Sequence, residues 1–123
     1  SIVSALSVSL EMMRKEGLPN IIARHARMGK VVRDGIKSLG LPLFAEESHA
    51  SNTVTAVAAS DGLDTKKMLK ILREEHRVIL AGGQQQLDSK IFRIGHLGWV
   101  TEDDIKAVIS ALEVVLPQAG FRT

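Results

Sequence analysis

Apolar residues recur at helical spacing over the first forty positions of the chain. Four of them share one face of a first helix, namely Ile2, Leu6, Leu10 and Met13. Gly17 and Pro19 predict that this helix ends near residue 16 and that a second helix begins at Pro19 and ends at the capping residue Gly40. The face predicted to be buried in the second helix consists of Ile22, His25, Met28, Val32, Ile36 and Leu39, and the face predicted to stay in solvent consists of Arg24, Arg27, Lys30, Arg33 and Lys37.

After residue 40 the pattern alternates between strands and helices. Strands are predicted at residues 41–44 as a short edge, at 52–59 as a β-branched run, at 77–81 and at 90–96. Residues 60–62 form a turn, Asp64 caps a helix over residues 65–75, and a capping box of Thr101 and Asp104 opens a last helix that Pro117 ends after Leu116. The strands before and after residues 82–89 are expected to pair as a hairpin with a wide loop.

This order of elements defines the expected fold class. Two helices are followed by a strand, a helix, two strands and a helix, which indicates an α+β fold. We expect a small mixed or antiparallel sheet of three to four strands with helices packed on one side, preceded by two N-terminal helices. All 123 residues fit one domain.

Composition excludes several kinds of protein. The chain has no cysteine, which rules out disulfides and thiolate metal sites and favours a cytoplasmic setting. No apolar run approaches the roughly 20 residues that span a bilayer. The four histidines lie in four separate segments without metal-ligand spacing, so no metal site is expected. The basic second helix leaves a nucleic-acid-binding module as a remote alternative, because only 3% of the residues are aromatic and could stack on bases.

Two features could carry binding chemistry. Arg93 interrupts an apolar strand, and a guanidinium there needs an anion, which could be a substrate carboxylate or a structural partner. Gly82 and Gly83 could let the backbone approach a ligand closely or could form a plain turn. From the residues alone both alternatives stay open. No catalytic triad and no phosphate loop can be identified.

The segment KIFRIGHLG at residues 90–98 resembles the segment near the end of class V, fold-type-I pyridoxal-phosphate aminotransferases. The alanine-glyoxylate and serine-pyruvate group is most similar, together with a branch labelled soluble hydrogenase small subunit. Further matches fall in the same order along the chain: Glu16-Gly17-Leu18, Arg24-His25, Leu39-Gly40-Leu41, Thr53 to Val57, and Ala81-Gly82-Gly83.

The resemblance implies that residues 1–123 are a C-terminal small domain and that the large cofactor-binding domain is absent. Arg93 would bind the α-carboxylate of a small amino acid or of a 2-oxo acid such as glyoxylate or pyruvate, with Gly82 and Gly83 as an adjacent loop. Pyridoxal phosphate, its lysine and the other catalytic groups would lie in the large domain of a cytoplasmic homodimer.

Alone, the 123-residue chain is then expected to bind no cofactor, to be inactive, and to expose apolar surface near Ile2, Val3 and Leu6 where the large domain packs. The alternative is a self-sufficient α+β regulatory module that binds an anionic effector through Arg93 and the glycine pair.

Overall fold

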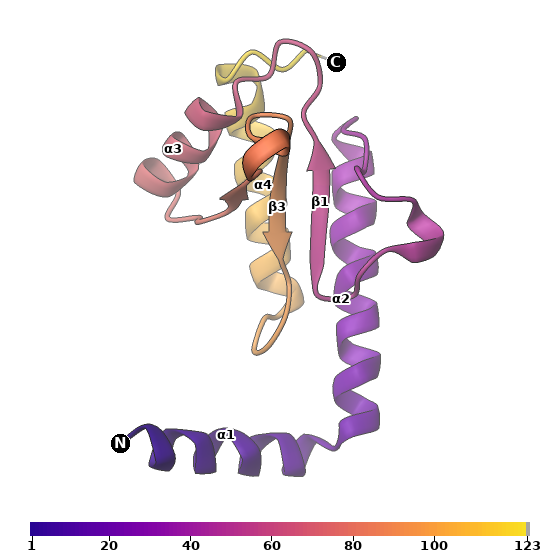
Figure 1. Ribbon diagram of the computed structural model, residues 1–123, viewed down its shortest axis with the longest axis vertical. Coiled ribbons are helices and arrows are strands. Elements are labelled where there is room, and N and C mark those ends of the chain that lie inside the picture. The colour runs from indigo at the N-terminus through magenta and orange to yellow at the C-terminus, as the bar shows by residue number, and fades with distance from the viewer. Residues whose placement is uncertain (123) are drawn as a thin grey trace.

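A computed structural model describes residues 1–122 as four helices and a three-stranded sheet (Figure 1). The elements in chain order are α1 Ile2–Glu16, α2 Leu18–Ser38, η1 Glu47–His49, β1 Val54–Ala58, α3 Thr65–Glu75, β2 Ala81–Gly82, η2 Gln85–Leu87, β3 Ile91–Gly95 and α4 Glu102–Gln118. The predicted α+β class, with two helices before the sheet, is confirmed.

The sheet has the strand order β1-β3-β2 and is antiparallel throughout. β3 is the central strand, with Phe92 opposite Val57 on β1 and opposite Gly82 on β2. The predicted hairpin is thus formed by β2 and β3. The predicted edge strand at residues 41–44 is reduced to a single bridge between Leu43 and Val57.

Helices α2 and α4 cover one face of the sheet, and α3 closes its end near β2 (Figure 1). The face that they cover supplies Val57, Phe92 and Ile94 to the core. Each is 3% exposed or less. The helices contribute the other large buried side chains, including Val32, Ile36, Met68, Leu72, Leu112 and Val115. Burial of each such side chain contributes roughly 1.5–3 kcal/mol to folding.

The helix ends largely follow the sequence signals. Asp64 accepts a hydrogen bond from the Lys67 amide as the cap of α3, and Thr101 and Asp104 form the complete capping box of α4. Pro117, however, lies inside α4, which continues to Gln118. A proline has no N–H and so removes one backbone hydrogen bond, and because the helix ends one residue later at Gln118, this loss is confined to its last turn.

Two other predictions are wrong. Residues 77–80 are not a strand, because Arg77 has a φ of 57° and the Val78 amide is hydrogen-bonded to the Leu72 carbonyl at the end of α3. Ile22 is exposed rather than buried, since the first turns of α2 extend beyond the sheet.

Helix α1 stands apart from this core. It turns away from the lower end of α2, and none of its residues is buried (Figure 1). Its apolar side chains are therefore open to solvent, as expected near Ile2, Val3 and Leu6, which are 88%, 76% and 55% exposed.

Candidate functional site

Arg93 lies at the middle of β3, on the face of the sheet opposite α2 and α4. Because side chains alternate along a strand, its buried neighbours Phe92 and Ile94 point to the opposite face. The residues directly across from Arg93 are Ala56 on β1 and Ala81 on β2. These two small side chains leave space above the sheet for a long guanidinium.

One edge of the Arg93 guanidinium is held by the backbone. Its Nε donates a hydrogen bond of 3.0 Å to the carbonyl oxygen of Gly82. Within residues 1–122, no carboxylate pairs with Arg93 and no protein acceptor binds its two terminal nitrogens. No buried side-chain nitrogen or oxygen in this range lacks a partner, so those nitrogens are open to solvent. Arg93 is thus oriented and retains two donors.

The two glycines predicted beside the site have different roles. Gly82 supplies the carbonyl that orients Arg93. Gly83 packs against the chain itself, because a Cβ built on it would lie 1.9 Å from the carbonyl oxygen of Leu87. The space that a glycine leaves there is filled by the backbone that returns through η2 to β3. The close approach predicted at Gly83 is therefore made by the protein's own backbone.

The end of β3 is anchored by a buried histidine. His96 is 1% exposed, its Nδ1 donates to the Asn52 carbonyl at 3.1 Å, and its Nε2 accepts from the Thr55 hydroxyl at 2.8 Å. Burial lowers the pKa of His96 because it disfavours the charged imidazolium. A neutral His96 therefore ties β3 to β1 on the face opposite Arg93.

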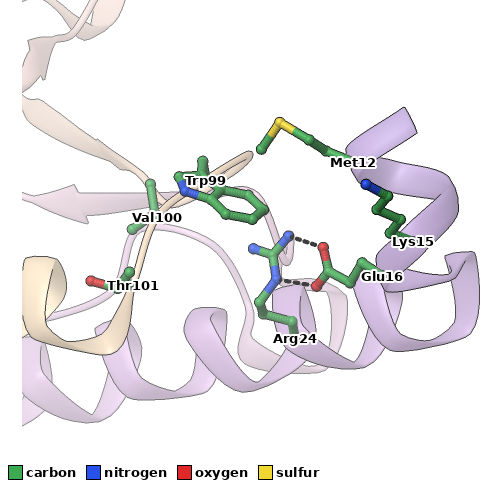
Figure 2. Close-up of a pocket in the computed structure, with 7 residues that line it drawn as sticks. All are labelled: Met12, Lys15, Glu16, Arg24, Trp99, Val100 and Thr101. Atoms are coloured by element: carbon green, nitrogen blue, oxygen red, sulfur yellow. Dashed lines mark hydrogen bonds and ion pairs between the residues drawn. The ribbon is translucent and has the colours of Figure 1, made fainter. Parts of the chain in front are cut away.

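A second polar cluster lies at the corner between α1 and α2, and sequence reasoning missed it. Arg24, predicted to stay in solvent, donates from Nε and Nη2 to both carboxylate oxygens of Glu16, at 2.6 and 3.1 Å (Figure 2). Its Nη1 donates to the Gly98 carbonyl at 2.7 Å. The Glu16 carboxyl has a lowered pKa because Arg24 hydrogen-bonds to it. All three guanidinium nitrogens of Arg24 are thus used.

The loop after β3 is held by two neighbouring residues of α2. While Arg24 binds the Gly98 carbonyl, His25 accepts the Gly98 amide proton at 3.1 Å through Nε2. The Arg24 guanidinium also lies 6.0 Å from the centre of the Trp99 ring. In Figure 2 the Met12 side chain extends from α1 toward Trp99. We call Glu16, Arg24, His25 and Gly98 the corner clasp.

The corner clasp borders two open cavities of about 450 and 410 Å³, with apolar side chains from α1 and from the loop after β3. The residues that line both are Met12, Glu16, Arg24 and Trp99. The polar atoms at this corner are already paired with each other, so the cavities offer mainly apolar surface.

Neither a metal site nor a membrane span is found in the part of the chain that the structure describes. Residues 1–122 contain no group of three or more histidines and carboxylates that could hold a metal ion. None of the described helices combines the length and the apolar character needed to cross a bilayer.

No protein-family model matches the chain, but individual proteins do. It is 44% identical to the soluble hydrogenase 42 kDa subunit of Anabaena cylindrica over 98% of this chain and 31% of that protein. It is 36% identical to the serine–glyoxylate aminotransferase of Arabidopsis thaliana, over 94% of this chain and 29% of that protein. The pyridoxamine-pyruvate aminotransferase structure from Mesorhizobium loti superposes with a TM-score of 0.89 at 34% identity, covering 95% of this chain and 30% of that one. The chain therefore spans about 30% of the length of the relatives it matches.

Proposed function

We propose that this chain is the C-terminal, substrate-carboxylate-binding small domain of a longer class V aminotransferase, a proposal supported by its similarity to about 30% of the length of such enzymes. The homologues depend on pyridoxal phosphate, which supplies the chemistry of amino-group transfer. The observation that carries the proposal is Arg93, oriented by the Gly82 carbonyl and left with two free donors on the sheet face opposite α2 and α4.

The lysines of this chain do not fit a site for pyridoxal phosphate. A lysine that forms a Schiff base is typically activated by desolvation or by a neighbouring cation. Every lysine in the described residues is exposed. We therefore place the cofactor in the remainder of the longer protein, and assign to residues 1–123 the recognition of the substrate's acid end.

The planar fork of Arg93 suits this role. Two parallel N–H donors match the two oxygens of a carboxylate, and a charge-assisted bond of this kind contributes roughly 1.5–3 kcal/mol. Since its Nε is already bonded to Gly82, the terminal nitrogens face the substrate from a fixed direction. Binding the acid end in this way orients the amino or keto group for reaction.

We propose a small amino acid and a 2-oxo acid as substrates. The names of the relatives include transfer to glyoxylate and to pyruvate. The same resemblance supports a cytoplasmic homodimer as the state of the longer protein. A self-sufficient effector-binding module is less well supported, because the apolar side chains of α1 have no cover in the described chain.

The test is steady-state kinetics of the longer protein with Arg93→Ala and Arg93→Lys. Loss of the fork should lower kcat/KM for amino acid substrates by about 10- to 100-fold, and lysine should be nearly as poor as alanine because it is a point charge. Arg27→Ala, at an exposed position of α2, is the matched control and should be near wild type. Near-normal turnover by Arg93→Ala would overturn the proposal.

A further inference from the structure

The corner clasp differs from an ordinary surface ion pair in the number of its hydrogen bonds and in the low exposure of its side chains. Arg24 uses three nitrogens to join the last residue of α1 to the loop that follows β3. Its side chain is only 20% exposed and that of Glu16 only 23%, whereas the Glu11 to Arg14 pair on the same helix is 47% and 74% exposed. We propose that Arg24 is a positioning residue, which fixes the direction of α1 relative to the sheet face that carries Arg93. The inference rests on the proposed function, in which α1 contacts the remainder of a longer enzyme.

The backbone alone does not fix this direction. Between α1 and α2 stands only Gly17, with φ of 87° and ψ of 133°, and α2 begins without a side-chain capping bond. Glycine adopts such a φ at low cost and restricts its neighbours little. α1 buries no residue against the core. The Asn20 side chain also donates to the Glu16 carbonyl, at 2.8 Å, but it joins α1 only to α2, whereas the corner clasp joins α1 to the loop that follows β3.

The other end of the corner clasp, at Gly98, is connected to Arg93 through the hydrogen-bonded residue His96 and strand β3. Gly98 is held at its carbonyl by Arg24 and at its amide by His25. Two residues earlier, His96 is buried and bonded to β1, and from there β3 runs through the middle of the sheet to Arg93. The corner clasp therefore ties Glu16, and with it the direction of α1, to the same sheet that carries Arg93.

The length of α1 amplifies any error at this corner. Its 15 residues make it about 22 Å long at 1.5 Å per residue. A rotation of about 5° at Gly17 would move its far end by about 2 Å, and a misplacement of about 1 Å can lower a reaction rate 100-fold. Small angular freedom at Gly17 would therefore matter for a carboxylate that must be held at a set distance from the reactive centre.

The direct test measures the position of α1 in the 123-residue chain, at a concentration at which sedimentation velocity shows a monomer. The chain lacks cysteine, so Ser4→Cys on α1 and Ser110→Cys on α4 place two spin labels without competition. Labelled chain is diluted with unlabelled chain, and the distribution of label distances is measured by pulsed electron spin resonance. We expect a distribution at least twice as broad with Arg24→Gln as without it, an intermediate one with Arg24→Lys, and no change with the control Glu11→Gln. An unchanged distribution in Arg24→Gln overturns the inference.

The functional test is a double-mutant cycle in the longer protein. Arg24→Gln should lower kcat/KM for the amino acid about tenfold in the wild-type background and less than twofold when Arg93 is already alanine, because Arg24 acts through Arg93. Glu11→Gln should have no effect in either background. Equal effects of Arg24→Gln in both backgrounds would mean that it acts elsewhere and would overturn the inference.

The two proposals fail in different ways. If Arg93→Ala leaves turnover unchanged, the carboxylate role is wrong, and the label distances still decide whether Arg24 fixes α1. If Arg93→Ala impairs turnover but Arg24→Gln and Arg24→Lys do not, the proposed function stands and the positioning role is wrong. Urea unfolding of each variant verifies that it is folded before either conclusion is drawn.

Discussion

The Nε2 atom of His96 lies 2.8 Å from the hydroxyl oxygen of Thr55, and this pair is buried between β1 and the segment that follows β3. The imidazole donates from Nδ1 to the Asn52 carbonyl, so the neutral form has both ring nitrogens satisfied. Because burial lowers the pKa of His96, the neutral imidazole accepts a second proton less readily in the folded chain than in the unfolded chain.

Stability should therefore fall in mild acid. The contribution of neutral His96 is complete above the unfolded pKa of about 6.5 and is lost as the pH falls through the lower folded value. We expect the free energy of unfolding in urea to decrease between pH 7 and pH 5, and the decrease to be smaller in His96→Gln. His49→Gln, at an exposed position, should retain the wild-type slope. Equal slopes in all three proteins would contradict the assignment.

Gly83→Ala should be strongly destabilising. The added Cβ would meet the Leu87 carbonyl oxygen at 1.9 Å, and backbone cannot move away as a side-chain end can. We expect a loss of about 3 kcal/mol in the free energy of unfolding. Gly82→Ala is the matched control, because its nearest contact is a Leu69 methyl at an ordinary 3.4 Å. Similar losses in the two variants would show that chain flexibility, rather than the close approach, is the cause.

The isolated chain should self-associate through α1. Several of its apolar side chains, among them Leu6 and Leu10, are more than half exposed on a helix that buries no residue. Sedimentation velocity should show a larger average mass as concentration rises, and the double variant Leu6→Gln and Leu10→Gln should reduce this effect. Ser4→Gln with Ser7→Gln, on the polar side of the same helix, should not. A chain that stays monomeric at all concentrations would refute this prediction.

Thr101→Ala should weaken the start of α4. The Thr101 side chain accepts the Asp104 amide, and the Asp104 carboxylate accepts the Thr101 amide. Removal of the hydroxyl leaves an unpaired donor in the first turn and should cost about 1 kcal/mol in urea unfolding. Ser110→Ala, at an exposed position within α4, should change stability by less than half as much.

The order and kind of the elements could be predicted from the sequence because they depend on local signals. Asp64 begins α3 and Gly17 separates α1 from α2, where a cap and a helix breaker were predicted. The strand predicted at residues 90–96, which carries Arg93, is found as β3. These features depend on residues within a few positions of each other, so spacing is sufficient to find them.

The length of β2 could not be predicted in this way. Residues 77–80 have the composition of a strand, yet the turn at Arg77 and the bond from Val78 to Leu72 commit them to the end of α3. Strand propensity is overridden here because the turn that ends α3 uses a backbone group that a sheet would need.

Spacing and propensity along the chain are sufficient to predict an α+β domain and to identify one arginine in an apolar strand. The surroundings of each charged side chain depend on the folded arrangement. Arg24 was predicted to stay in solvent because helical spacing places it beside other basic residues, but its partner Gly98 is 74 positions away along the chain. Hydrogen bonds between distant segments depend on how the chain folds back on itself, so local sequence patterns do not predict them.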